Sequence, residues 1–266
     1  MGPLDFSAYH LPALELDEVR HGLIVNALAN LGGTKSVEFS HWTLGGPGAC
    51  AIKIGQHSIV LGALDEGQCR TLADITVHTD YPGVVGPDLT AKWFADRANE
   101  LGLQFLEPEP QQIYSISAKP SYPGAPGCAR PATIQDAPLL ADWLTEFYQE
   151  VVPHDPVPPR EELEQAAGED RFLLWIDKGE PVSMAGTGRR LKTSAAITSV
   201  YTPPERRARG YAGSVTAATV ERIYAEGHKI ACLYADLRNP ASNRCYAKIG
   251  FAPVCGSLHF HRHRVA

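Results

Sequence analysis

Residues 200–214 decide the fold of this chain, and they read Val-Tyr-Thr-Pro-Pro-Glu-Arg-Arg-Ala-Arg-Gly-Tyr-Ala-Gly-Ser. Just before the prolines, residues 196–201 form a short β-branched run that is typical of a strand. The Pro203-Pro204 pair cannot donate to a strand ladder and ends it. After Gly210, residues that share one helical face are Ala212, Val215, Thr216, Thr219, Val220 and Ile223. The stretch therefore predicts a strand, a basic turn and a helix.

The junction between this strand and this helix is predicted to bind an anion. The first N–H groups of a helix lack intrahelical acceptors and carry the positive end of the helix dipole. Arg206, Arg207 and Arg209 add positive charge around the same point. A pyrophosphate suits such a place. From these residues alone, an ordinary solvated basic turn remains the alternative.

Composition narrows the classes of protein that the chain can represent. The net charge of −6 and the pI near 5.9 lack the basic character of a nucleic-acid binder. No apolar run approaches the roughly 18 residues of a membrane span, and no secretory signal is visible at the start. Six cysteines without a C-x-x-C pair are typical of reduced thiols. We expect a cytoplasmic protein with no nucleic-acid and no membrane partner.

The length of 266 residues allows two modest domains. Residues 119–131 contain four prolines and two glycines, which favours a linker there. We therefore predict an N-terminal α/β domain over residues 1–120, a linker over 121–130 and a second domain over 131–266. In the second domain we predict helices at 136–151, 160–167 and 239–250, a hairpin at 172–186, and strands at 230–235, 251–255 and 257–262.

A second sequence block lies at residues 239–251, Asn-Pro-Ala-Ser-Asn-Arg-Cys-Tyr-Ala-Lys-Ile-Gly-Phe. Together with Arg-Ala-Arg-Gly-Tyr-Ala at 207–212, it resembles the GNAT (GCN5-related N-acetyltransferase) superfamily. The first block matches the family pattern Gln/Arg-x-x-Gly-x-Gly/Ala, and the second matches its Asn…Tyr-x-x-x-Gly-Phe segment. The resemblance covers roughly residues 130–266. It implies a GNAT fold, an α/β fold with a mixed (α+β) sheet, in the C-terminal domain.

The resemblance also implies an acyl-CoA donor, usually acetyl-CoA, bound at this junction. Backbone N–H groups of residues 207–212 would hold its pyrophosphate, and residues 200–202 would pair with its pantetheine arm. The Val200 amide would polarise the thioester carbonyl. Asn239 would hydrogen-bond the pantetheine. The residues expected to bind the donor are Val200, Tyr201, Thr202, Arg207, Ala208, Arg209, Gly210, Tyr211, Ala212, Gly213, Ser214, Asn239 and Tyr246.

Tyr246 matches the family tyrosine that protonates the departing CoA thiolate. A tyrosine with an ordinary pKa of about 10 still carries its proton near neutral pH, so it can act as a general acid. A core tyrosine at helical spacing is the alternative. The general base stays open, because residues 193–201 contain no carboxylate. We prefer a water held by Thr198 and Ser199; the other candidates are Glu146, Glu150, His154 and Asp155.

The activity that the resemblance implies is direct transfer of an acetyl group from acetyl-CoA to the primary amine of a small molecule. A protein or peptide N-acetyltransferase is the second enzyme hypothesis. A non-catalytic acyl-CoA-binding sensor is the non-enzymatic one.

The first half loosely repeats the order of the second. We predict a helix at 17–31, short strands at 36–39, 49–54, 58–61, 104–106 and 111–117, a strand at 71–78, a turn at 81–87, and a helix capped by Asp88 that runs to 101. The turn lacks arginines and carries prolines where N–H donors would be needed. We interpret residues 1–120 as a degenerate GNAT-like domain in a tandem arrangement that no longer binds CoA. An unrelated α/β domain that shields the acceptor pocket is the alternative.

Three histidines, His259, His261 and His263, share one face of the last predicted strand. No cysteine or acidic residue is adjacent to them in the sequence, and the family needs no metal. We interpret them as a polar strand face and expect no metal ion, and metal binding is the alternative.

Overall fold

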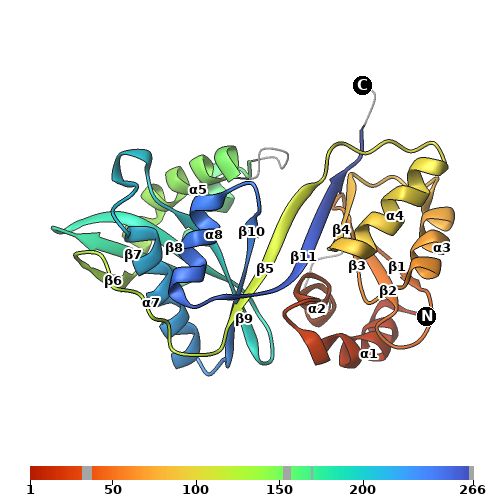
Figure 1. The fold of residues 1–266 in the computed structure, drawn as a ribbon, viewed down its shortest axis with the longest axis horizontal. Coiled ribbons are helices and arrows are strands. Elements are labelled where there is room, and N and C mark those ends of the chain that lie inside the picture. The colour runs from red at the N-terminus through yellow and green to blue at the C-terminus, as the bar shows by residue number, and fades with distance from the viewer. Residues whose placement is uncertain (32–37, 152–156, 169, 264–266) are drawn as a thin grey trace. The chain divides into compact units, whose positions relative to one another are not determined.

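The computed structural model describes residues 1–31, 38–151, 157–168 and 170–263. The chain divides into two compact units. The first comprises Met1–Tyr114, Tyr234–Pro240 and Pro253–Ala266, and the second comprises Ser115–Leu233 and Ala241–Ala252. The linker predicted at 121–130 lies inside the second unit. Neither unit is one continuous stretch, because the end of the chain belongs to the first unit (Figure 1).

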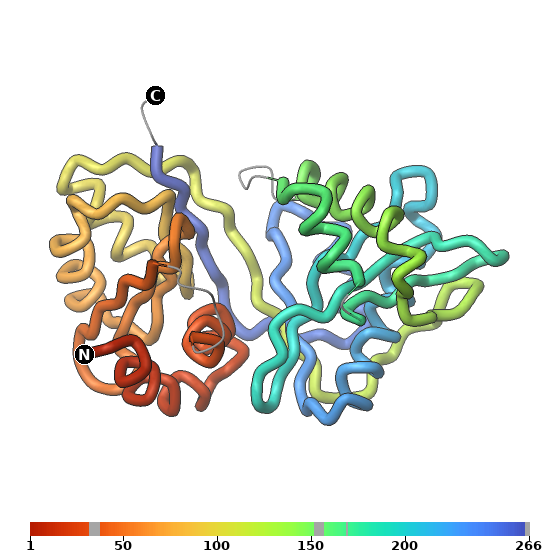
Figure 2. The backbone as a smooth tube through the Cα atoms, turned by 180° about the vertical axis from the view of Figure 1, so that it is seen from behind, coloured from red at the N-terminus to blue at the C-terminus, as the bar shows by residue number. Residues whose placement is uncertain are grey.

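The helices and strands alternate along most of the chain, as Figures 1 and 2 show. The α-helices are α1 (Pro3–Leu14), α2 (Gly22–Ala29), α3 (Glu66–Thr76), α4 (Asp88–Glu100), α5 (Ala137–Val151), α6 (Arg160–Ala167), α7 (Tyr211–Ala225) and α8 (Pro240–Ile249). Short 3-10 helices are η1 (Glu15–Asp17), η2 (Ile134–Asp136) and η3 (Pro204–Arg206). The strands are β1 (Phe39–Thr43), β2 (Cys50–Ile54), β3 (Ile59–Leu61), β4 (Gly83–Pro87), β5 (Glu109–Ile116), β6 (Cys128–Pro131), β7 (Phe172–Asp177), β8 (Glu180–Arg190), β9 (Ser194–Tyr201), β10 (Ile230–Asp236) and β11 (Ala252–His261).

The first unit is built on strands in the order β1-β2-β3-β4-β11-β5. Strand β4 pairs in parallel with β3 and antiparallel with β11, so the last strand of the chain completes the sheet of the first unit. Helices α3 and α4 pack on one face of this sheet. Their buried residues include Leu72 and Phe94, and Leu258 and Phe260 of β11 pack against the same core. Apolar residues on β11 therefore alternate with residues that face the other side.

Two predictions for the first unit are wrong. Residues 71–78 were predicted as a strand, but most of them belong to α3, which begins with a capping box between Asp65 and Gln68. The buried residues Cys69, Leu72, Ala73 and Thr76 follow helical spacing, and this outweighs the β-branched composition. Residues 81–87 were predicted as a turn, but Gly83–Pro87 forms β4. A Cβ at Gly83 would lie 2.2 Å from the Phe260 carbonyl oxygen, so this glycine permits close strand pairing.

Three smaller differences concern element boundaries. The helix predicted at 17–31 is instead a helical region that begins at Pro3 and contains α1, η1 and α2. Residues 104–106 form no strand, and Phe105 makes an isolated bridge to Arg262. The two closing strands predicted at 251–255 and 257–262 are the single strand β11. Of the strand predicted at 36–39, residues 36 and 37 lie outside the described residues, and β1 begins at Phe39.

The second unit contains strands in the order β10-β9-β8-β7-β6. Strands β6, β7, β8 and β9 pair antiparallel, whereas β10 pairs in parallel with β9. Helices α5 and α6 cover one face through a core that includes Leu140, Leu163, Phe172 and Met184. Helix α7 packs on β7, β8 and β9 from the other face, as the two opposite views in Figures 1 and 2 show. The predicted hairpin and the helices after residue 130 are confirmed.

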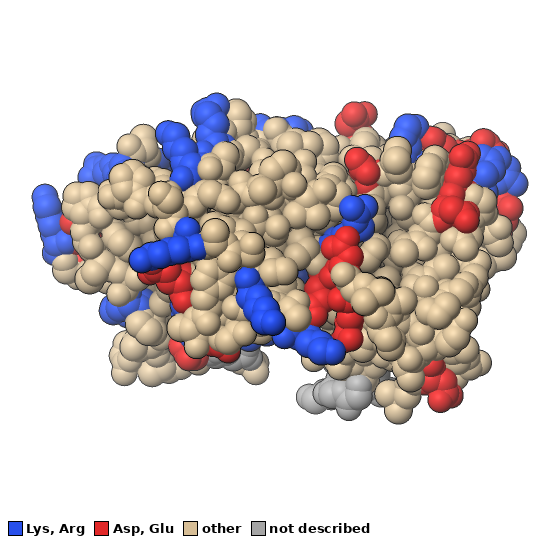
Figure 3. All heavy atoms as spheres, turned by 60° about the horizontal axis from the view of Figure 1, so that its bottom comes forward, with Lys and Arg blue, Asp and Glu red and all other residues tan. Residues whose placement is uncertain are grey.

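The distribution of charged side chains and the hydropathy of the helices can be described for the folded chain. On the face that Figure 3 shows, acidic and basic side chains form small separate groups within a larger uncharged surface. In the part of the chain that the structure describes, no helix is both long enough and apolar enough to cross a membrane.

Candidate active site

The end of strand β9 carries a bulge just before the turn. Thr198 is paired with Gly186 of β8, and Tyr201 is paired with Met184, so β9 advances three residues where β8 advances two. Ser199, inside this bulge, has a left-handed backbone with φ of 50°. A bulge bends the strand and increases its local twist. The parallel register with β10 covers Ser194 to Ala196, so Val200 and Tyr201 lie beyond it.

The turn contains two left-handed residues, and the second of them directly precedes the right-handed helix α7. Pro203 precedes η3, and after it Ala208 and Gly210 have φ of 60° and 84°. Gly210 is the N-cap of α7, and glycine adopts this left-handed conformation without the steric cost that other residues carry. Left-handed residues next to right-handed ones turn successive N–H groups toward one point and form an anion-binding concavity. The predicted strand, turn and helix are confirmed.

The N-terminus of α7 supplies N–H groups at this concavity. At the start of the helix, the Ser214 N–H donates to the Gly210 carbonyl oxygen at 3.0 Å. The N–H groups of Tyr211, Ala212 and Gly213 precede it and have no acceptor within the helix. Tyr211 anchors this end, because its hydroxyl donates to Asp177 Oδ2 at 2.6 Å. That hydrogen bond raises the pKa of Tyr211. The concavity can therefore accept a phosphate group through backbone donors.

The three arginine side chains of the turn have protein partners. Arg207 forms a bidentate pair with Glu150, with distances of 2.9 and 2.6 Å. Arg206 pairs with Glu180 at 2.9 Å, and Arg209 donates to a backbone carbonyl at 3.4 Å. These pairs offset much of the positive charge that the sequence places here. Binding of an anion at the turn therefore depends on backbone N–H groups more than on arginine charge.

Tyr201 and Glu146 form a partly buried polar contact beside the turn. The Tyr201 hydroxyl donates to Glu146 Oε2 at 2.7 Å, and the Arg207 guanidinium lies 5.7 Å from the centroid of the Tyr201 ring. Burial of Tyr201 and its hydrogen bond to Glu146 raise the pKa of Tyr201 to about 12. The hydroxyl therefore stays protonated at neutral pH. Two of the candidate bases therefore already accept hydrogen bonds: Glu146 accepts from the Tyr201 hydroxyl, and Glu150 accepts from the Arg207 guanidinium.

The other groups expected to take the amine proton are a water held by Thr198 and Ser199, and the side chains of His154 and Asp155. Thr198 Oγ1 and Ser199 Oγ lie 3.5 Å apart at the bulge, where a water would contact both hydroxyl groups. His154 and Asp155 lie outside the described residues.

Tyr246 lies in the middle of α8 and is half-buried. Its ring packs on Phe251, with centroids 6.0 Å apart. Burial raises the pKa of Tyr246 above its ordinary value, and the nearby Cys245 adds to this effect. A raised pKa keeps the proton on the hydroxyl, as a general acid requires. Asn239 directly precedes α8 in the chain and belongs, with residues 234–240, to the first unit.

One part of the surroundings was missed by sequence reasoning. Tyr122 and Ala125, from the proline-rich stretch, pack on the first turn of α7: the Ala125 N–H donates to Ser214 Oγ at 2.7 Å. A Cβ at Gly213 would lie 2.2 Å from Cζ of Tyr122. Burial and the nearby Cys245 raise the pKa of Tyr122. The small residue in the third position of α7 is the signal in the sequence that another side chain approaches there.

Comparison with known proteins agrees with this architecture. Residues 174–258 match the family model described as FR47-like protein, and no curated protein matches the chain by sequence. A GCN5-related N-acetyltransferase from Sphaerobacter thermophilus is similar in structure, with a TM-score of 0.67 and 15% identity over 100% of this chain and 95% of that one. One from Kribbella flavida has a TM-score of 0.59 and 14% identity over 92% and 96%. A tandem GNAT protein from the clavulanic acid biosynthesis pathway has a TM-score of 0.55 and 10% identity over 96% and 95%.

The fold is therefore of the GNAT type, an α/β fold with a mixed sheet, and similarity to a tandem GNAT protein extends over nearly the whole chain. Within the C-terminal part, residues 174–258 are similar in sequence to the FR47-like family, and the solved structures named above share the GNAT fold. The resemblance drawn from residues 207–212 and 239–251 is confirmed, since both blocks fall within the matched segment.

Proposed function

We propose that this chain is an acetyl-CoA-dependent N-acetyltransferase that acts on the primary amine of a small molecule. The observation that carries the proposal is the junction of β9 and α7, where a bulged strand end meets two left-handed residues and a 15-residue helix. Its backbone donors suit the pyrophosphate of acetyl-CoA. In the proposal, residues 207–214 hold the pyrophosphate and residues 200–202 pair with the pantetheine arm. Asn239 hydrogen-bonds that arm.

The proposed chemistry is direct transfer between two bound substrates. The neutral amine attacks the thioester carbonyl carbon, a C–N bond forms and the C–S bond breaks. The Val200 N–H stabilises the negative charge that develops on the carbonyl oxygen. The departing thiolate takes the proton of the Tyr246 hydroxyl, and a water takes the proton that the amine loses. Because burial raises the pKa of Tyr246, this residue begins each cycle protonated at neutral pH.

We assign the amine proton to a water relay at Thr198 and Ser199. Glu146 already accepts from Tyr201, and Glu150 already pairs with Arg207, so both carboxylates have donors within 3 Å. Accordingly, no single carboxylate-to-alanine change should lower kcat by more than about two orders of magnitude. A larger loss in a folded variant contradicts the relay.

The first unit, in this proposal, is a degenerate GNAT-like domain without its own CoA. The equivalent junction there is β4 followed directly by α4, and the first residue of α4 is Asp88. Its Oδ1 accepts from the Leu89 N–H, and its Oδ2 would lie 2.6 Å from a Cβ at Gly256. A carboxylate at a helix N-terminus occupies the position that a phosphate needs and repels it. Acetyl-CoA should therefore bind with a stoichiometry of one per chain.

The test is a transfer assay that measures release of the free CoA thiol with acetyl-CoA and a panel of small amines, alongside calorimetric titration with acetyl-CoA. We expect binding at one site and turnover with at least one amine. Tyr246→Phe should keep the affinity for acetyl-CoA and lower kcat by about 10- to 1000-fold. If acetyl-CoA neither binds nor shifts the melting temperature, the proposal is wrong.

Other outcomes of the same assay select the other candidates. Turnover confined to peptide substrates would indicate a peptide N-acetyltransferase. Tight binding with no turnover on any amine or peptide would indicate an acyl-CoA sensor. We assign the protein to the cytoplasm, and its six free cysteines support a reducing compartment.

A further inference from the structure

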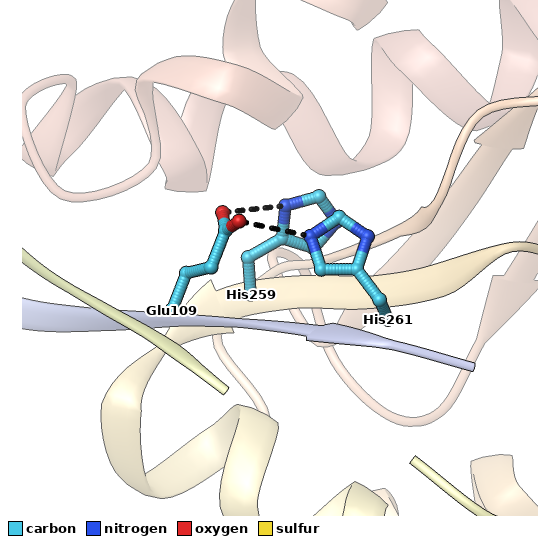
Figure 4. Close-up of side chains that lie close together, drawn as sticks. All are labelled: Glu109, His259 and His261. Atoms are coloured by element: carbon cyan, nitrogen blue, oxygen red, sulfur yellow. Dashed lines mark ion pairs between the residues drawn. The ribbon is translucent and has the colours of Figure 1, made fainter. Parts of the chain in front are cut away.

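Three side chains from distant parts of the sequence meet in the first unit. Glu109 is the first residue of β5, and His259 and His261 lie near the end of β11, which is the neighbouring strand. The two histidines are two residues apart, so they share a face of the sheet, opposite to Leu258 and Phe260. Figure 4 shows the three side chains projecting to the same side of the two strands, with the carboxylate opposite both imidazole rings.

The distances within this cluster suit a shared cation. Glu109 Oε2 lies 3.8 Å from His259 Nδ1, and Glu109 Oε1 lies 3.5 Å from His261 Nε2. Both separations exceed the 2.7–3.2 Å of a good N–H···O hydrogen bond. One nitrogen or oxygen atom from each residue lies within 4.8 Å of the other two. A tetrahedral zinc ion with bonds of roughly 2.0–2.1 Å holds its ligand atoms about 3.3 Å apart, so small side-chain rotations complete the geometry.

Burial and a supporting contact strengthen the arrangement. The side chains of Glu109, His259 and His261 are 11%, 18% and 14% exposed. Ser58 Oγ lies 2.9 Å from His259 Nε2, on the far side of the ring from Glu109. When Nε2 donates to Ser58, Nδ1 directs its lone pair toward the carboxylate. Metal-binding histidines in proteins are oriented by hydrogen bonds of this kind from the second ring nitrogen.

We propose that Glu109, His259 and His261 bind a divalent first-row transition metal ion, with zinc as the ion that the ligand set fits best. Two imidazoles and one carboxylate are zinc ligands, and they leave a fourth position for water or a small anion. Calcium and magnesium prefer sites made entirely of oxygen atoms. The sequence next to the histidines gives no sign of this site, because its acidic ligand lies 150 positions earlier in the chain.

The first test is titration of tag-free, chelator-treated protein with Zn²⁺ alone, followed by calorimetry, with Co²⁺ as a spectroscopic substitute. We expect one tight site per chain, with weak or no binding of Mg²⁺. Glu109→Gln and His259→Ala should each weaken Zn²⁺ binding by at least about 100-fold, because each removes one of three ligands. His78→Ala is the matched control: His78 is an exposed histidine of the same unit just after α3, and its loss should leave the affinity unchanged.

A second measurement avoids variants altogether. Long-range ¹⁵N–¹H spectra of the wild-type protein should show Zn²⁺ bound through Nδ1 of one histidine and through Nε2 of another.

A further variant tests the contact behind His259. Ser58→Ala should weaken Zn²⁺ binding by about 10-fold, the effect expected when an outer partner of a metal ligand is lost. The proposal is overturned if the wild-type protein lacks a stoichiometric Zn²⁺ site. It is also overturned if Glu109→Gln and His259→Ala bind Zn²⁺ as the wild type does, or if His78→Ala loses as much affinity as they do.

Discussion

Replacing Gly213 with alanine places a methyl group where the Tyr122 ring lies. The new Cβ would be 2.2 Å from Tyr122 Cζ and 2.4 Å from its hydroxyl oxygen. Carbon atoms in contact are normally about 3.5–4.0 Å apart, so the ring must move by more than about 1 Å. Such overpacking costs about 1–3 kcal/mol, and alanine in a helix regains about 1 kcal/mol over glycine. The net result is a destabilisation of about 1 kcal/mol.

The sign of this effect depends on Tyr122, and that makes it a sharp test. In a Tyr122→Ala background the ring is absent, so Gly213→Ala should stabilise the protein by about 1 kcal/mol through helix propensity. The coupling free energy is then about 2 kcal/mol. Urea denaturation measures it, and thermal melting should show a change of about 2–4 °C per kcal/mol in a protein of this size. Tyr122→Phe is the control, since it keeps the ring and therefore the clash.

The result that refutes the reasoning is a Gly213→Ala effect of the same sign and size in both backgrounds. In that case the Tyr122 segment does not lie on the first turn of α7. The same variants also probe the donor site: if this turn binds the pyrophosphate, Gly213→Ala should raise KM for acetyl-CoA, because the displaced ring changes access to the backbone donors of α7.

Three further predictions concern the turn, its Glu150–Arg207 pair and the separate Arg130–Asp136 pair. Gly210→Val should raise KM for acetyl-CoA at least about tenfold while lowering stability by about 1–2 kcal/mol, since valine is strained at φ of 84°; steady-state kinetics with unchanged KM would contradict the site. Glu150→Gln releases the Arg207 guanidinium and removes a negative charge, so KM for acetyl-CoA should fall about two- to fivefold at low salt, and a rise would argue against an anion site. Asp136→Asn should cost about 1–2 kcal/mol at pH 7, because the bidentate bond from Arg130 holds the pKa of Asp136 well below its usual range. That contribution is complete above the ordinary carboxyl pKa of about 3.9 and is lost as the pH falls toward the depressed folded value, so the two proteins should converge in urea melts below about pH 4.

The backbone conformation of β9, the turn and the start of α7 could be predicted from the sequence, because the residues that determine it are close together in the chain. The β-branched run, the two prolines and Gly210 act within a few residues of where they stand, and they predicted β9, the turn and α7. The partners of the arginines were not predictable. Glu150 and Glu180 approach from a helix and a strand that only the fold brings to the turn.

Long-range contacts account for the errors as well. Residues 71–78 have a strand-like composition, but the buried face of α3 packs on α4, and that packing decides the outcome. Gly83 has the composition of a turn residue, but it lies in β4 next to Phe260 of β11, which comes almost 180 positions later in the chain. About 150 positions separate Glu109 from His259 and His261, which is why the histidines alone indicated a polar strand face.

The course of β11 has a consequence for synthesis of the protein. A ribosome releases residues 1–114 long before residues 253–261, yet β4 needs the latter as its antiparallel partner. Until β11 has been synthesised, β4 has an unpaired edge that can associate with other chains. A gene fragment encoding residues 1–120 alone should therefore yield an aggregation-prone polypeptide. Joining the coding sequence of β11 behind it through a short flexible segment would restore the missing partner.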